Sequence, residues 1–350
     1  MINLNKRIAT LAAAAAVSAI ALAGTATTTF AQEVTLRLHQ FLPAQANVPK
    51  YVLDVWADKI EEESDGRIKI QRFPSMQLGG TPPELIDQAI DGIADIVWTV
   101  AGYTPGRFPR TEVFELPFMM TNAEATSKAY WEIAEKYMLD DDFKDFHTIG
   151  VWVHGPGLIH SKEPIRTVAD LNGVKLRAPT RVTNMMFSSM GATPVGMPVP
   201  AIPEALSKGV VDATVIPWEV AGILKVPELV SNHTEFGDAS LYTTSFIFAM
   251  NKDRYESLPD DLKAVIDDNS GGNIAEWAGN NWAAIEEPGL KVVQSKKKNK
   301  FHVIPESEVE KMRAAAAPVF ERWYREVAKD GIDGAALLAD ARTLIDKYSK

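Results

Sequence analysis

The chain contains no cysteine in its 350 residues. This absence excludes a disulfide framework, thiolate zinc sites, iron–sulfur clusters, a thiol nucleophile and attachment of a lipid to an N-terminal cysteine. Histidine is also scarce, and its six residues leave little material for a metal centre.

Catalytic sequence motifs are missing as well. The chain has no nucleophile elbow, no phosphate-binding loop followed by lysine, no dinucleotide fingerprint and no paired-histidine zinc helix. We therefore predict no catalytic residues, no metal and no cofactor, and nothing in these patterns indicates an enzyme.

Clustered positive charge is absent too. Aspartate and glutamate number 46 against 36 lysines and arginines, which gives a formal net charge of −10. Binding to a phosphate backbone requires clustered Lys and Arg that release counterions, so we expect no nucleic-acid partner. The short basic run at residues 296–300 is interpreted as a solvated loop.

One segment is strongly apolar. Lys6 and Arg7 precede an apolar run over residues 8–23, which is shorter than the roughly 20 residues of a membrane span. Small residues follow at the −3 and −1 positions of a cleavage site after Ala31, so residues 1–31 are predicted to be a secretory signal peptide; the alternative is an N-terminal anchor. The mature chain keeps 34 basic and 46 acidic residues, a net charge of −12, and is expected not to span a membrane.

The first part of the mature chain alternates between strand and helix patterns. Residues 34–38 and 68–73 are predicted strands, separated by a helix that starts near Pro49 and ends at Gly66. A capped helix over residues 81–92 is followed by the apolar run 94–100, which is typical of a strand buried on both faces. This alternation indicates a parallel sheet.

A similar rhythm recurs after residue 150, so we predict two α/β lobes joined by strands that cross between them. We expect a helix break at Pro288-Gly289, and a helix capped by Ser307 and Glu310 that Pro318 kinks. The remaining predicted elements are strands at 151–153, 174–178, 211–216, 242–250 and 301–304 and helices starting near 167, at 181–190, at 203–208 and over most of 258–285.

Arg177 lies at the carboxyl end of the predicted strand 174–178, just before a helix start. In open α/β sheets, ligands bind outside these strand ends, and a guanidinium presents a rigid fork to a carboxylate. Position alone leaves two interpretations open, a ligand anchor or an ion pair at the sheet edge.

The sequence around Arg177 resembles the extracytoplasmic solute-binding proteins of TRAP transporters, the DctP-type dicarboxylate-binding family. The resemblance covers nearly all of the mature chain. It rests on DLNGVKLRAPT, MGATPVGM and EALSKGVVDATVIP within residues 170–217, supported by FPSMQLGG (73–80), FELPFM (114–119) and MNKDRYESLPDDLK (250–263).

This resemblance implies two α/β domains with a hinge, a long helix that spans both, and a cleft arginine that grips the ligand carboxylate and matches Arg177. We place domain I at residues 32–154 plus 243–284 and domain II at residues 155–242 plus 285–350. The family also implies a non-enzymatic receptor that captures an organic acid in the periplasm and delivers it to a TRAP permease in the membrane.

Three positions depart from the better-known members of the family. Gly157 occupies the place of a second arginine, Ile216 that of a ligand-binding asparagine, and Val199 that of an aromatic residue. One carboxylate anchor therefore remains while polar contacts at the far end are lost. This pattern favours a monocarboxylate, such as an aromatic or hydroxy acid, over a C4-dicarboxylate.

The predicted binding residues surround this anchor. Thr180 and Asn184 are expected to add hydrogen bonds, and His39 and His154, at strand ends, either contact the ligand or are hydrogen-bonded locally. The aromatic residues expected to enclose an apolar ligand body are Phe41, Trp98, Tyr103, Trp218 and Tyr242.

Three alternatives remain open. A C4-dicarboxylate or sugar acid binds if backbone N–H groups or His154 replace the missing arginine. A cation beside the ligand would use Glu219, although one carboxylate is a weak basis for a metal site. An exported lyase or hydrolase would need an acid–base pair, for which Glu219 and His154 are the candidates.

Overall fold

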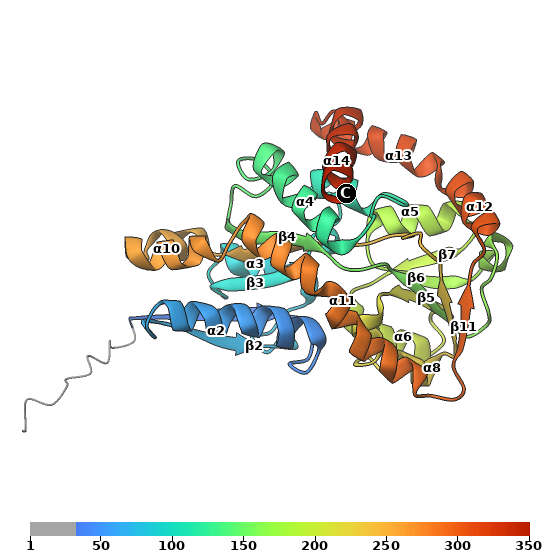
Figure 1. The fold of residues 1–350 in the computed structure, drawn as a ribbon, viewed down its shortest axis with the longest axis horizontal. Coiled ribbons are helices and arrows are strands. Elements are labelled where there is room, and N and C mark those ends of the chain that lie inside the picture. The colour runs from blue at the N-terminus through green and yellow to red at the C-terminus, as the bar shows by residue number, and fades with distance from the viewer. Residues whose placement is uncertain (1–32) are drawn as a thin grey trace, which may run out of the picture.

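The computed structural model describes residues 33–350 and contains two β-sheets, one on each side of the molecule (Figure 1). The predicted signal peptide and its cleavage point lie outside the described residues. Within residues 33–350, none of the helices is long and apolar enough to cross a membrane.

The first sheet has the strand order β2-β1-β3-β10-β4. β1 pairs in parallel with β2 and β3, which confirms the parallel arrangement predicted for this part of the chain, whereas β10 runs antiparallel to both of its neighbours. Every residue of β3 is buried, as its continuous apolar sequence predicts. The strands are β1 (Val34–Gln40), β2 (Ile68–Phe73), β3 (Ile96–Val100), β4 (His147–Val153) and β10 (Ser245–Met250).

The second sheet has the order β11-β9-β5-β8-β6-β7. β6 pairs in parallel with β7 and β8, and Arg177 lies opposite Val195 and Thr214 in this register. The strands are β5 (Leu158–Ser161), β6 (Lys175–Ala178), β7 (Thr193–Gly196), β8 (Ala213–Ile216), β9 (Asn232–Glu235) and β11 (Lys300–Val303).

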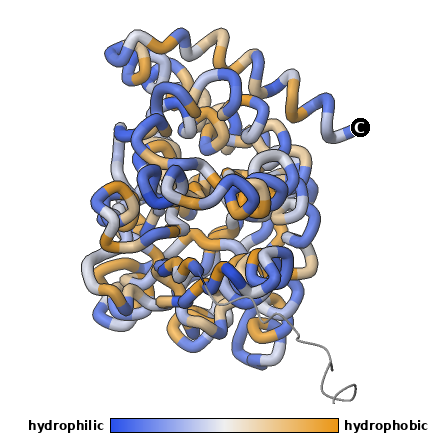
Figure 2. The backbone as a smooth tube through the Cα atoms, turned by 90° about the vertical axis from the view of Figure 1, so that its left-hand side faces the viewer, coloured by the Kyte–Doolittle hydropathy of each residue, from blue (hydrophilic) through white to orange (hydrophobic). Residues whose placement is uncertain are grey.

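Helices flank both sheets, and most of them are amphipathic. Figure 2 shows hydrophobic and hydrophilic residues alternating along the helix that ends at the C-terminus, α14, whose buried Leu338, Ala341 and Ile345 lie on one side. The helices are α2 (Asp54–Glu63), α3 (Leu85–Ile90), α4 (Ala123–Tyr137), α5 (Arg181–Ser189), α6 (Ile202–Ser207), α7 (Trp218–Ala221), α8 (Val226–Leu229), α9 (Lys252–Glu256), α10 (Asp260–Asp268), α11 (Gly272–Gln294), α12 (Glu306–Ala316), α13 (Pro318–Val327) and α14 (Gly334–Tyr348).

The long helix α11 runs across the molecule from the first sheet to the second (Figure 1). Its first half packs against α4 and β4, and its second half packs against α7. A side chain at Gly289 would lie 2.0 Å from the backbone oxygen of Trp218, so only glycine permits this close approach between α11 and α7.

The predicted helix break at Pro288-Gly289 is wrong, because α11 continues through Pro288 to Gln294. Proline removes one backbone donor from a helix and crowds the preceding turn. In the turn before Pro288, Asn47 Nδ2 donates to the backbone oxygen of Ile285 at 2.7 Å, which ties this part of α11 to the segment before α2. Packing against α7 then holds the helix together beyond the proline.

The predicted cap of the next helix is also wrong. α12 begins at Glu306 after Pro305, with no side-chain hydrogen bond at its N-terminus, so Ser307 and Glu310 lie inside the helix. Pro318, the predicted kink, is the first residue of the separate helix α13.

The chain passes between the sheets along two short crossings in addition to α11. Residues 154–157 connect β4 to β5, and residues 236–244 connect β9 to β10. The crossings are bonded to each other, because Gly157 N donates to the Tyr242 backbone oxygen at 3.0 Å and Thr243 Oγ1 donates to the His154 backbone oxygen at 2.7 Å. Both crossings therefore bring side chains to the space between the two sheets.

Candidate functional site

A narrow cavity lies between the two sheets, and both sheets and both crossings contribute to its walls. Its volume, measured as the space open to the centre of a water-sized sphere, is about 30 Å³. The first sheet and the segments beside it contribute mainly aromatic residues, and the second sheet contributes the charged and aliphatic ones. The aromatic and titratable side chains of the lining are Phe41, Trp98, Tyr103, His154, Arg177, Glu219, Tyr242 and Phe246.

Arg177 is the only positively charged side chain that lines this cavity, and it is 1% exposed. Two backbone oxygens fix its orientation: Nε donates to Met197 at 2.9 Å and Nη1 donates to Val215 at 2.9 Å. Nη2 has no hydrogen-bond partner among the described residues. Burial lowers the pKa of Arg177, but a guanidinium stays charged at any ordinary pH.

An unpaired buried charge is costly, because low-dielectric surroundings replace its hydration. None of the ion pairs found within residues 33–350 involves Arg177. The guanidinium is therefore held in place with one donor group unused, an arrangement that an incoming anion would complete with charge-assisted hydrogen bonds.

Aromatic rings form the wall on the side of the first sheet. The Phe41 and Trp98 rings are stacked, with centroids 4.9 Å apart and planes 12° apart, and Tyr103 meets Phe41 edge-on at 5.6 Å. Trp98 also stacks on Phe246 at 4.8 Å. Such a wall offers a flat apolar molecule both burial and ring stacking.

Gly157 determines how this wall is closed at the crossings. A Cβ atom at Gly157 would lie 2.0 Å from Cε1 of Tyr242, so the Tyr242 ring occupies the space where a longer side chain at position 157 would extend. The Tyr242 ring thus occupies the space next to position 157, where the family resemblance implies a second arginine in other members.

His154, on the other crossing, packs edge-on against Tyr242 at 5.6 Å. Its Nδ1 is hydrogen-bonded to the backbone oxygen of Gly155, and because a carbonyl only accepts, the proton lies on Nδ1. Burial, reinforced by the charge of Arg177 against the opposing effect of the Gly155 bond, lowers the pKa of His154 to about 4. Near neutral pH this ring is uncharged, so it adds no second cation to the cavity.

Glu219 is the acidic group of the cavity and is 6% exposed. Its Oε2 has no hydrogen-bond partner among the described residues. Burial, together with the neighbouring Glu286, raises the pKa of Glu219 well above its usual range, and the backbone N–H of Val220 opposes this only partly. Burial therefore favours the protonated, neutral form of the Glu219 carboxyl group.

The structure brings together some of the residues predicted from sequence and separates others. Four predicted residues do not line the cavity: His39, Thr180, Asn184 and Trp218. Those that line it are Arg177, Phe41, Trp98, Tyr103, His154 and Tyr242.

The four others are engaged elsewhere. His39 has both ring nitrogens bonded, Nδ1 to Gln88 Oε1 at 2.6 Å and Nε2 to the backbone N–H of Leu78 at 3.3 Å. Trp218 Nε1 donates to Glu235 Oε1 at 3.1 Å. Asn184 Nδ2 donates to the Thr180 backbone oxygen at 2.6 Å, and these two residues line a separate hollow at the cavity's outer side.

Reasoning from sequence missed Phe246 as a wall residue and named Glu219 only in alternatives. Phe246 lies in β10, a strand buried throughout, so its apolar sequence carries no period that distinguishes one face from the other. The three positions that depart from the family pattern all bear on the cavity: Val199 and Ile216 line it, and Gly157 admits the Tyr242 ring.

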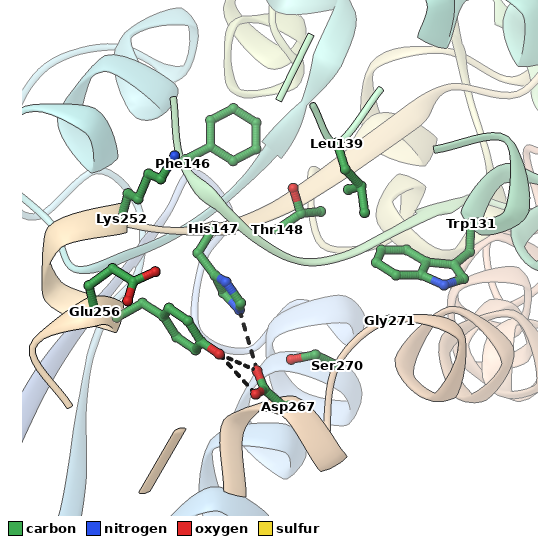
Figure 3. A pocket seen from close by; sticks show the side chains of 11 residues that line it. Trp131, Leu139, Phe146, His147, Thr148, Lys252, Glu256, Asp267, Ser270 and Gly271 are labelled. Atoms are coloured by element: carbon green, nitrogen blue, oxygen red, sulfur yellow. Dashed lines mark hydrogen bonds and ion pairs between the residues drawn. The ribbon is translucent and has the colours of Figure 1, made fainter. Parts of the chain in front are cut away.

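A second hollow lies on the outside of the first sheet, and it is larger, at about 350 Å³ by the same measure. Figure 3 shows its polar groups turned toward one another: Tyr255 donates to the Asp267 carboxylate at 2.7 and 2.8 Å, and His147 Nε2 lies 3.9 Å from the same group. The His147 and Tyr255 rings are stacked at 3.5 Å. Tyr255 and Asp267 therefore satisfy each other, whereas His147 Nε2 has no hydrogen-bond partner among the described residues.

Within residues 33–350, no three His, Asp or Glu side chains converge as metal ligands would. None of the side-chain hydrogen bonds found in that part of the chain joins Glu219 to His154, the candidate acid–base pair. The inner cavity is built to hold a molecule by one charge and several rings.

Comparison with known proteins agrees with this geometry. The family model described as bacterial extracellular solute-binding protein, family 7 (DctP), matches residues 39–327. A TRAP solute-binding protein from Rhodoferax ferrireducens, solved in complex with copurified benzoate, is 48% identical, with a TM-score of 0.88 and coverage of 90% of this chain and 98% of that one.

Two further solved structures are similar. A TRAP solute-binding protein from a marine metagenome, described as specific for aromatic acid ligands and crystallised with 3-hydroxybenzoate, is 47% identical, with a TM-score of 0.89 and coverage of 91% of this chain and 100% of that one. A protein from Bordetella bronchiseptica with bound mandelate is 28% identical, with a TM-score of 0.82 and coverage of 89% and 99%.

Proposed function

The chain belongs to the bacterial extracellular solute-binding proteins of family 7, and on that premise we propose that its ligand is an aromatic monocarboxylate. The observation that carries this proposal is Arg177, a buried guanidinium with Nη2 unpaired, at the edge of a cavity walled by Phe41, Trp98 and Tyr103. The arginine binds the carboxylate, and the rings enclose the aromatic body.

The lining argues for one carboxylate rather than two. Arg177 is the only cation that faces the cavity, and Tyr242 fills the space beside Gly157. Val199 and Ile216 are aliphatic, so a second carboxylate at the far end would be buried without a partner, at a cost of several kcal/mol.

The ligands of similar proteins point the same way. The two solved proteins at 47–48% identity hold benzoate and 3-hydroxybenzoate, and the more distant one holds mandelate. Each of these ligands has one carboxylate on or next to an aromatic ring, which is the chemistry that this cavity supports.

We further propose that the protein works in the periplasm, exported by the signal peptide at residues 1–31, and delivers its ligand to TRAP permease subunits in the membrane. In the same proposal, residues 32–154 plus 243–284 and residues 155–242 plus 285–350 are the two domains. The ligand enters when these domains separate about the two crossings and is enclosed when they close.

A thermal-shift and calorimetric screen of the chain without residues 1–31 tests the ligand class. Benzoate, 3-hydroxybenzoate and mandelate are compared with succinate as the C4-dicarboxylate and with a sugar acid. A ligand at 100 times its Kd adds roughly 2.7 kcal/mol to stability, so the aromatic acids are expected to raise Tm. A rise with succinate or the sugar acid but with none of the aromatic acids would overturn the proposal.

A further inference from the structure

Glu219 is a second ionisable group in the lining of the inner cavity, in addition to Arg177. Its carboxyl group lines the cavity, is 94% buried by exposed area, and has Oε2 unpaired among the described residues. A buried carboxyl without a hydrogen-bond partner costs stability, so its presence in an otherwise apolar lining calls for a compensating contact.

The surroundings of Glu219 determine its charge. The neighbouring titratable groups are Glu286 on α11 and Tyr242 on the crossing, and Glu235 on β9 faces Glu286 in turn. No cation pairs with Glu219 among the ion pairs found in residues 33–350. Two carboxyl groups in a water-poor space cannot both be ionised cheaply, and burial raises the pKa of Glu286 to about 8 as well.

Arg177 and Glu219 both line the cavity, and both lie near Tyr242. Both influence the pKa of Tyr242, whereas neither is among the groups that shift the pKa of the other. The backbone of Glu219 is held firmly, because Asn47 Nδ2 donates to its backbone oxygen at 3.1 Å and to that of Ile285 at 2.7 Å. Glu219 therefore presents a carboxyl group from a fixed backbone position in the same cavity that Arg177 lines.

We propose that Glu219 hydrogen-bonds a hydroxyl group on the ligand, so that the receptor prefers hydroxy-substituted aromatic acids. The inference deepens the proposed function and depends on it. A protonated carboxyl both donates and accepts, which matches a hydroxyl, whereas a second ligand carboxylate would be repelled once either group ionised.

Selectivity between two probes tests this role. Kd for benzoate and for 3-hydroxybenzoate is measured by calorimetry near pH 6.5 with the wild type, Glu219→Met and Glu219→Gln. Glu219→Met is expected to reduce the preference for 3-hydroxybenzoate about tenfold, the effect of one hydrogen bond. Glu219→Gln, which keeps a donor and an acceptor, is expected to restore most of the preference.

Glu286→Gln is the matched control. It removes the neighbouring acid but leaves the lining intact, because Glu286 does not face the cavity. The proposal is overturned if Glu219→Met leaves the ratio of the two Kd values unchanged, if Glu286→Gln changes it equally, or if wild-type binding requires added cations.

The same data separate this inference from the proposed function. If the wild type binds neither probe, the aromatic-acid proposal fails and the hydroxyl contact fails with it. If the wild type binds both probes with a ratio that Glu219→Met does not alter, only the role of Glu219 is wrong.

Discussion

The inner cavity and the outer pocket beside His147 and Tyr255 differ in the opposite sense from what their sizes suggest. The outer pocket is about 350 Å³ and the inner cavity about 30 Å³, yet in the outer pocket Tyr255 and Asp267 are hydrogen-bonded to each other. In the inner cavity, Arg177 Nη2 and Glu219 Oε2 have no partner among the described residues. A fully buried cation with one unused donor group, rather than volume, distinguishes the inner cavity.

This difference has an energetic basis. A group that is already paired gains little from a ligand, because the ligand must first replace its existing partner. A buried group without a partner carries its desolvation cost in the free protein and recovers it when a ligand arrives. The following variants test whether the two hollows differ in this way.

Arg177→Met is expected to have the largest effect. Removing the buried cation leaves the ligand carboxylate without its partner, and losses of this kind cost 2–5 kcal/mol, so Kd for benzoate should rise at least about 30-fold in calorimetry. Arg177→Lys, which keeps the charge but not the planar fork, should recover only part of the affinity. Unchanged binding by Arg177→Met would move the site away from this cavity.

Gly157→Ala is expected to weaken binding roughly tenfold, since the new Cβ would lie 2.0 Å from the Tyr242 ring and push it into the ligand's space. Gly272→Ala serves as the control beside the outer pocket, where a Cβ would lie 3.3 Å from Trp131 Cδ1. It should leave Kd unaltered. Equal effects of the two variants would mean that the crossing has no special part in the cavity.

Glu286→Gln is expected to change stability as a function of pH. The pKa of this carboxyl is raised to about 8 in the folded protein, so its contribution is fully present below the unfolded pKa near 4.5 and is lost as pH rises toward 8. The variant should therefore gain stability over the wild type as pH rises from 5 to 8, by up to about 3 kcal/mol in denaturant unfolding. A pH-independent difference would show that Glu286 ionises freely.

Asp267→Ala, in the outer pocket, is expected to have the smallest effect. It removes the partner of Tyr255 and His147, but the carboxylate is half exposed, so the loss of stability should stay below about 1 kcal/mol. Benzoate affinity should not change. A clear loss of affinity would mean that the outer pocket takes part in binding.

The sequence predicted the place of Arg177 in the cavity lining better than the places of the residues around it. Arg177 could be predicted because it lies at the carboxyl end of a predicted strand and within a sequence segment that resembles the family. Thr180 and Asn184 share that segment, but the N-terminal turn of α5 binds them to each other, and no pattern reveals which way a turn faces. Likewise, no sequence pattern reveals that Trp218 is oriented by its hydrogen bond to Glu235 and not toward the cavity.

The course of α11 illustrates what local rules miss. Pro288 and Gly289 together predict a helix break, because each of these residue types disfavours a helix on its own. Two distant contacts accompany the continued helix. Asn47, about 240 positions earlier, donates to the Ile285 backbone oxygen, and α7 packs closely against Gly289. Contacts between segments so far apart leave no periodic signal in the sequence.

The hydrogen bonds between the two crossings bear on how ligand binding is coupled to the relative orientation of the sheets. His154 and Tyr242 belong at once to the cavity wall and to the two segments that join the sheets, and their backbones are bonded to each other's crossing. Any rotation of one sheet relative to the other must therefore displace the wall that touches the ligand. In the proposed mechanism, the segments that line the cavity are also the segments that connect the two sheets. Ligand binding and domain closure are then coupled directly, without a further element between them.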